Sequence, residues 1–185
     1  EMTMRAFKEA STPPTAPTFL SISANVFDEI TDLEVIKLPQ ISNNFNPDFS
    51  SIEILSNKII DSDNPMIILG DRISHSNSSD QAIEFAELTG AKVYVSSTAE
   101  INFPTDHKQY LGALPNLLPK AKEIIDKHDL VISIGSNVFD GFFYIKGQLF
   151  GNKTYHAHID SSASAISRNE QTNLGILSSP NTALK

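Results

Sequence analysis

The feature that most constrains the fold is a series of short segments, most of them continuous apolar runs, several of which end at glycine or small polar residues. The segments are Met66–Leu69, Val93–Val95, Leu130–Ile134, Thr154–Ile159 and Leu174–Leu177. They are too short for helices and carry little alternation, which is typical of strands covered on both faces. Such strands belong to a parallel sheet whose connections pass over its faces.

Helical patterns fill the spaces between these strands. Residues 49–60 place isoleucine and leucine on one side of a predicted helix. Ser78 and Gln81 form a candidate capping box for a helix that runs to Leu88 and closes at Gly90. A further helix is predicted over 119–127, and a long loop over about 96–114. The alternation predicts an α/β fold: a doubly wound, Rossmann-like parallel sheet of about six strands with helices on both faces.

The first 48 residues follow a different pattern. Residues 2–10 have helical spacing and precede Pro13 and Pro14, which end a helix. Thr18–Ser23 alternates and predicts a strand, while residues 26–48 are linker-like. We expect both chain ends to be cut sites within a longer polypeptide. The strand would then lack its neighbours, and would pack on its own domain, lose order or pair between copies.

Composition excludes several classes of function. The net charge is −8, which disfavours nucleic-acid and membrane-surface binding, and the apolar runs are too short to span a bilayer. There is no cysteine, so disulfides, thiolate metal sites and cysteine nucleophiles are excluded. No secretory signal pattern is present at the start of the chain, and we expect a cytoplasmic location.

Candidate binding residues follow the predicted strands, because ligands of open parallel sheets bind beyond the strands' carboxyl ends. They are Gly70, Gly135, Ser136, Asn137 and Asp160. Gly70 stands alone where a dinucleotide fingerprint needs three glycines. We therefore favour glycines that only turn the chain, and keep a weaker nucleotide crevice as the alternative.

The histidines offer two further interpretations. His156 and His158 alternate on one strand and share a face, which can place two ligands on a metal. We favour a structural or surface pair and predict no metal site, since convergent third and fourth ligands are not evident. His107 lies in the long loop after Val93–Val95, where an imidazole can move protons.

The segments in order resemble the middle domain of thiamine-diphosphate-dependent enzymes, the group of acetolactate synthases, pyruvate oxidases and benzoylformate decarboxylases. The matching segments are 10–22, 64–70, 103–112, 129–135 and 157–160, of which Phe103-Pro104-Thr105-Asp106-His107 is the most specific. Benzoylformate decarboxylase is the most similar, through Gly135-Ser136-Asn137-Val138-Phe139, Tyr144 and Gly147-Gln148.

The resemblance implies roles that residue patterns alone do not. It makes residues 1–25 the tail of a pyrimidine-binding domain, 26–48 a linker and 49–185 the central domain. His107 would assist proton transfer in the active site of a 2-oxo-acid decarboxylase. Thiamine diphosphate and Mg²⁺ would be held by flanking pyrimidine-binding and diphosphate-binding domains of a homo-oligomeric parent, with no cofactor in this fragment.

Departures from the family pattern shape the remaining expectations. Arg72 follows Gly70-Asp71 where the family's cofactor-binding domain has Gly-Asp-Gly, so we expect this sequence not to include that domain. Asp160-Ser161-Ser162 lacks the second acid of FAD-binding relatives, which disfavours FAD. We expect a structural domain that is inactive alone. The alternatives are a nucleotide-binding module for FAD, ADP or a coenzyme A fragment, and, less favoured, an autonomous small enzyme.

Overall fold

The computed structural model describes residues 1–34, 37, 41, 44–100, 102–138 and 146–185. The chain divides into two compact units, Glu1–Asn43 and Asn44–Lys185. The second unit begins close to the predicted start of the central domain, and Phe45 is attached to it: the carbonyl oxygen of Phe45 accepts hydrogen bonds from Ser179 N and from the hydroxyls of Ser178 and Thr182.

The first unit contains helix α1 (Met2–Ser11) and the 3₁₀ helix η1 (Ala24–Asp28), whose residues are all exposed or half-buried. The strand predicted over Thr18–Ser23 is wrong, because residues 18–23, all described, form no strand. An extended segment becomes a strand only when a second segment accepts and donates its main-chain hydrogen bonds. Phe19 is accordingly 94% exposed, and Thr18 Oγ1 donates to the carbonyl oxygen of Ala6 at 3.1 Å.

The second unit is built on a parallel sheet, as predicted. Within the described residues its strands are β1 (Pro65–Leu69), β2 (Lys92–Val95), β3 (Tyr110–Ala113), β4 (Leu130–Ile134), β5 (Tyr155–Asp160) and β6 (Leu174–Leu177). Their order is β3-β2-β1-β4-β5-β6, and every neighbouring pair is parallel. The order turns back at β1, so β1 and β4 mark the switch point at which the chain begins to build the sheet in the opposite direction.

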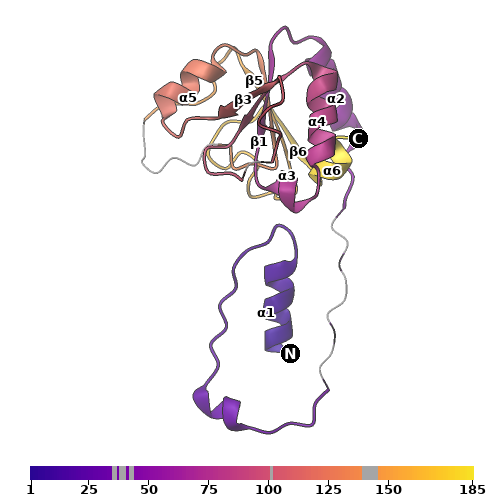
Figure 1. Cartoon of the computed structure of the whole chain (residues 1–185), viewed down its shortest axis with the longest axis vertical. Helices are drawn as coiled ribbons and strands as arrows, with labels where there is room; N and C mark the ends of the chain where they lie inside the picture. Colours follow the sequence, from indigo (N-terminus) through magenta and orange to yellow (C-terminus); the bar gives the residue numbers. More distant parts are fainter. Residues whose placement is uncertain (35–36, 38–40, 42–43, 101, 139–145) are drawn as a thin grey trace. The chain divides into compact units, whose positions relative to one another are not determined.

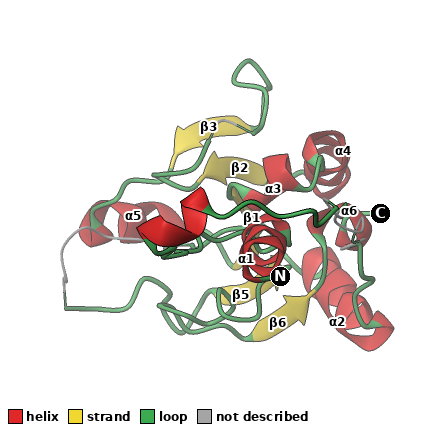
Figure 2. Cartoon of the chain, turned by 90° about the horizontal axis from the view of Figure 1, so that it is seen from below, coloured by secondary structure: helices red, strands yellow, loops and turns green. Residues whose placement is uncertain are grey.

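Helices cover both faces of this sheet (Figure 1). They are α2 (Phe49–Ile60), α3 (Arg72–His75), α4 (Ser79–Thr89), α5 (Leu118–Ile125) and α6 (Pro180–Ala183). Both views place α2, α4 and α6 on one side of the strands and α5 on the other (Figures 1 and 2). The doubly wound α/β class is therefore confirmed.

Local signals in the sequence explain most helix ends. Asp48 caps α2, since its side chain accepts from Ser51 N, and Gly90 closes α4 in the left-handed conformation with φ 66°. The capping box at α4 is wrong. Ser78 is the N-cap residue, but its hydroxyl bonds Ser76 Oγ at 2.6 Å instead of the helix, and Gln81 Oε1 is buried without a partner.

Strand β3 and helix α3 are among the elements that the sequence patterns did not predict. Strand β3 lies inside the segment predicted as a loop, and its half-exposed residues lack the continuous apolar run of the central strands. It is an edge strand, so only one side of it needs to be paired. The short helix α3 follows β1 directly and is too brief to show a helical period.

The core lies on both faces of the sheet because successive side chains of each strand point to opposite sides. Ile67 and Ile132 pack beneath the α2 and α4 face, while Met66, Ile68 and Val131 pack against α5. All five are 1% exposed or less. This double burial explains why β1 and most of β4 are apolar.

The α5 face continues over β5 as a polar stripe that contains His156 and His158. His156 is buried, its ring stacks on Phe150 with centroids 3.9 Å apart, and Nε2 pairs with Ser133 Oγ at 2.9 Å. Its Nδ1 lies 3.0 Å from the carbonyl oxygen of Gln171. Both nitrogens of His156 are thus satisfied within the protein.

At the amino-terminal ends of the strands, Asp129 connects the start of β4 to the residues that precede β1. Its carboxylate accepts from Ser62 Oγ at 2.6 Å, Asp63 N at 2.8 Å and Asn64 N at 3.1 Å. Burial would raise the pKa of Asp129, but these hydrogen bonds lower it below its ordinary value.

Among the residues that the structure describes, there is no helix long and apolar enough to cross a membrane.

Replacement of the Asp129 carboxylate is expected to destabilise the second unit. Asp129→Ala leaves the amides of residues 63 and 64 without their acceptor, and we expect a loss of about 2 kcal/mol in the free energy of unfolding. Urea unfolding followed by circular dichroism measures it. Asp63→Asn, which changes an exposed side chain in the same turn, is the matched control. Equal stability of the two variants would contradict this role.

Burial of His156 predicts a stability that depends on pH. Burial lowers the pKa of His156 to about 3 from an ordinary 6.5, so below pH 6.5 the unfolded chain binds a proton that the folded chain does not. Stability is fully present above pH 6.5 and falls, by about 1 kcal/mol per pH unit, as pH drops toward 4.

Urea unfolding of the wild type and His156→Gln at several pH values isolates this contribution, because other titrating groups are shared. The variant should lose most of the slope, whereas His75→Gln, at an exposed histidine, should keep it. Should His156→Gln not fold, nuclear magnetic resonance of the wild type decides: a His156 ring that becomes charged near pH 6 contradicts the prediction.

Candidate functional site

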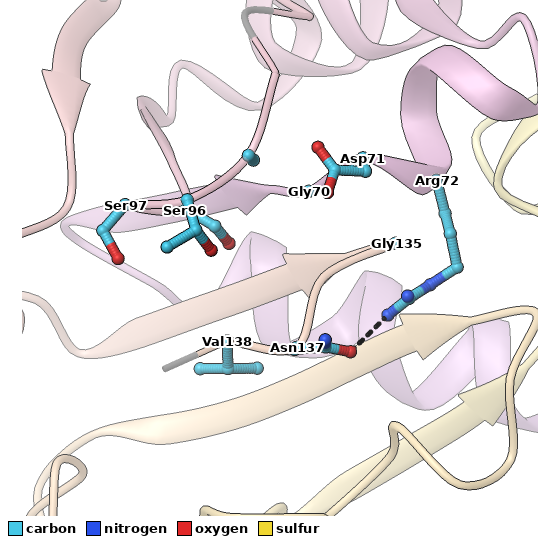
Figure 3. A pocket seen from close by; sticks show the side chains of 10 residues that line it. Gly70, Asp71, Arg72, Ser96, Ser97, Gly135, Asn137 and Val138 are labelled. Atoms are coloured by element: carbon cyan, nitrogen blue, oxygen red, sulfur yellow. Dashed lines mark hydrogen bonds between the residues drawn. The ribbon is translucent and has the colours of Figure 1, made fainter. Parts of the chain in front are cut away.

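The carboxyl ends of β1, β2 and β4 border a small open pocket with a volume of about 30 Å³. It is lined by 70–72 after β1, 96–99 after β2, and Gly135, Asn137 and Val138 after β4 (Figure 3). This is the edge where parallel sheets place their ligands. The candidates Gly70, Gly135 and Asn137 therefore lie together, as predicted from their positions after strands.

Close packing explains why two of these positions are glycine. A Cβ on Gly70 would lie 2.3 Å from the carbonyl oxygen of Gly135 and 2.4 Å from Ser136 Cα. Gly135 has φ 58°, a left-handed conformation that side chains disfavour, and faces Arg72. The two turns are thus pressed together, which gives both glycines a structural role independent of any ligand.

Arg72 lines the pocket beside Asn137 and forms an ion pair with Asp160, which lies behind the lining residues. Arg72 donates to Asp160 Oδ2 from Nε at 2.9 Å and from Nη2 at 2.7 Å. Nη2 also donates to Asn137 Oδ1 at 3.1 Å (Figure 3). The Asp160 side chain is fully buried, whereas that of Arg72 is 19% exposed. The guanidinium is therefore held in place, and the buried carboxylate of Asp160 balances its charge.

Further donors complete the surroundings of the Asp160 carboxylate. Ser162 N donates to Oδ1 at 2.7 Å, and His158 Nε2 lies 3.5 Å from Oδ2. The same His158 nitrogen is 2.9 Å from the carbonyl oxygen of Ser136, while Nδ1 is buried without a hydrogen-bond partner. Asp160 and Ser136 thus stand behind the residues that line the pocket.

The opposite wall carries hydroxyl groups. Ser96 Oγ and Ser136 Oγ are hydrogen-bonded to each other, and Ser136 Oγ accepts from Val138 N at 2.8 Å. Asp71 accepts from Glu100 N at 2.6 Å, which ties down the loop that follows β2. A pocket with hydroxyls and one balanced guanidinium can hold a small polar group by hydrogen bonds.

The metal interpretation of the His156 and His158 pair finds no support in their contacts. The nitrogens of His156 bond to Ser133 and Gln171, and the two rings are tilted by 34° with centroids 5.8 Å apart. In the described ranges of the chain, no group of three histidines or acidic residues gathers at metal-binding distance.

His107 lies outside the pocket. Its ring meets the ring of Phe103 edge-on, with centroids 5.1 Å apart, and its Nε2 is 3.3 Å from Glu87 Oε1 on α4. Gln109 N donates to Nδ1 at 3.3 Å. Since Nδ1 accepts, the ring proton resides on Nε2. The structure therefore does not bring His107 together with Gly70, Gly135 and Asn137.

Sequence patterns could not reveal two of these contacts. Arg72 and Asp160 are 88 residues apart, and Glu87 precedes His107 by 20. Only their places in the fold bring them together: Arg72 follows β1 and Asp160 ends β5, with β4 between the two strands, and Glu87 lies on α4. Phe139 and Tyr144, which carry part of the resemblance to benzoylformate decarboxylase, lie outside the described residues.

Comparison with known proteins gives one consistent result. The family model described as "Thiamine pyrophosphate enzyme, central domain" matches residues 52–185. Benzoylformate decarboxylase of Pseudomonas aeruginosa is 30% identical over 138 residues, which cover 73% of this chain and 26% of that protein. An acetolactate synthase of Mycobacterium avium is 29% identical over 115 residues, or 61% of this chain and 18% of that protein.

A solved structure shows the same arrangement of elements. Benzoylformate decarboxylase from Polynucleobacter necessarius superposes with a TM-score of 0.85 at 28% identity, covering 99% of this chain and 34% of that one. The chain thus spans only about a quarter to a third of the length of these relatives. It belongs to the thiamine pyrophosphate enzymes, and residues 52–185 are the central domain of such an enzyme, related to benzoylformate decarboxylase and acetolactate synthase.

Proposed function

We propose that this chain serves a 2-oxo-acid decarboxylase of the benzoylformate decarboxylase type, as a scaffold that contributes His107 to the reaction centre. The observation that carries the proposal is the similarity to benzoylformate decarboxylase, 30% identity over 138 residues. The Polynucleobacter enzyme supports it, since its likeness extends over 99% of the chain.

The described residues do not fit a thiamine diphosphate site of their own. A Mg²⁺ ion that holds a diphosphate needs carboxylate or carbonyl oxygen ligands from the protein. Asp71, the acid at the pocket mouth, already accepts from Glu100 N, and the described part of the chain gathers no cluster of three acidic or histidine side chains. Flanking pyrimidine-binding and diphosphate-binding domains would hold the cofactor, which supplies the electron sink for decarboxylation. On this proposal the fragment alone is inactive, and its parent is a homo-oligomer.

The chemistry available to His107 is proton transfer. Its ring is anchored on one side by Phe103, a core residue that is 3% exposed, and its exchangeable proton resides on Nε2. A positioned imidazole that gives or takes a proton typically accelerates a step by about 10²–10⁴-fold. The other ring nitrogen accepts a main-chain hydrogen bond, so Nε2 is the atom that would act.

The proposal is tested with the full-length protein that contains this chain, supplied with thiamine diphosphate and Mg²⁺. We expect release of benzaldehyde from benzoylformate, and a fall in kcat of about 10²-fold in His107→Ala. His75→Ala, at an exposed histidine, is the control and should retain activity. Conversion of pyruvate to acetolactate without benzoylformate turnover would overturn the assignment, as would full activity of His107→Ala.

A second candidate function is nucleotide binding in the pocket beside Arg72. It is favoured by the hydroxyl-lined wall and the guanidinium at the carboxyl ends of β1, β2 and β4, where α/β folds hold nucleotides. The balanced charge of Arg72 counts against a strong phosphate site, because Asp160 already occupies two of its donors.

Titration calorimetry of the chain with ADP, FAD and coenzyme A tests this candidate. Micromolar binding of any of them would support the module, and absence of heat would leave the scaffold role alone. The double variant Arg72→Gln with Asp160→Asn removes both charges together and avoids an unpaired buried carboxylate. Binding through Arg72 should weaken at least about tenfold in it, since a charge-assisted hydrogen bond is lost.

A further inference from the structure

The setting of His107 is more ordered than that of a solvated loop histidine. Its side chain is only 15% exposed, and its ring meets the buried ring of Phe103 edge-on. Phe103 in turn stacks on Tyr110, the first residue of β3, with ring centroids 6.3 Å apart. The loop thus attaches the imidazole to both the core and the edge of the sheet.

The main chain around His107 is also fixed to helix α4. Gln109 Nε2 donates to the carbonyl oxygens of Ala86 at 2.6 Å and Ala91 at 2.8 Å, at the end of α4 and just beyond it. His107 N donates to Pro104 O, and Tyr110 N donates to His107 O. Consequently the loop is attached to α4 through the side chain of Gln109, a contact that does not involve the ring of His107.

The side chain of Glu87 lies next to Nε2 of His107. It follows Ala86 on α4, and its Oε1 lies 3.3 Å from the ring nitrogen that bears the proton. Its side chain is 54% exposed, so it contacts water on one side and the imidazole on the other. A carboxylate that accepts an imidazole N–H fixes the tautomer and orientation of the ring.

We propose that Glu87 is a positioning residue for His107. From helix α4, its carboxylate accepts the Nε2–H of His107 and fixes the orientation of the ring until the proton is transferred. The catalytic part of this inference rests on the proposed function of His107, whereas the contact itself can be measured on the chain. Because Glu87 is largely exposed, it can turn into solvent and expose Nε2 without any movement of the backbone.

Nuclear magnetic resonance of the ¹⁵N-labelled chain tests the contact. In the wild type we expect a resolved His107 Nε2–H signal, protected from exchange with water by Glu87. Glu87→Gln keeps an acceptor oxygen and should keep the signal, while Glu87→Ala should lose it through exchange. Glu84→Ala, an exposed glutamate one turn earlier on α4, is the matched control and should keep it. An unchanged signal in Glu87→Ala, or none in the wild type, overturns the proposal.

Kinetics of the full-length protein test the consequence. Glu87→Ala should lower kcat by roughly tenfold with KM unchanged, because a misplaced group weakens the chemical step. Glu87→Gln should restore most of the rate, and Glu84→Ala should not alter it. Wild-type kcat in Glu87→Ala, where His107→Ala is impaired, would overturn the catalytic part. If His107→Ala is fully active, the proposed function fails, and the resonance experiment alone decides the contact.

Discussion

The structure depends on the mutual satisfaction of main-chain hydrogen bonds in a sheet that is buried on both faces. Met66, Ile67 and Ile68 of β1 are almost completely inaccessible, so water cannot form hydrogen bonds with their main-chain amide and carbonyl groups. The neighbouring strands β2 and β4, both parallel to β1, supply these hydrogen bonds. Unpaired polar groups in such an interior are costly, which makes the register of the central strands strict.

This constraint also produces the pocket. Parallel strands deliver all their carboxyl ends to one edge, so the turns after β1, β2 and β4 meet there although they are far apart in the chain. The turns of Gly70 and Gly135 are in such close contact that neither tolerates a side chain. Arg72 and Asp160 then join the ends of β1 and β5 by an ion pair whose buried carboxylate requires that partner.

The two candidate sites of the chain differ in what supports them. The pocket is a feature of the fold, and its lining allows a polar ligand while its balanced charges limit the affinity for phosphate. His107 is supported by the similarity to benzoylformate decarboxylase and by an ordered setting between Phe103, Gln109 and Glu87. None of the described residues of the first unit is buried, and Phe19 is almost fully exposed.

The sequence by itself determined the fold class and the strands of the centre. Runs such as Leu130–Ile134 are apolar because both faces are covered, a local pattern that needs no partner to be recognised. The sequence also indicated Gly70, Gly135 and Asn137 as candidate binding residues, because each follows a predicted strand. Tertiary structure alone decided β3, the absent strand at 18–23 and the Arg72–Asp160 and Glu87–His107 contacts. Each depends on which distant segment supplies a hydrogen-bonding partner, and no local periodicity encodes that choice.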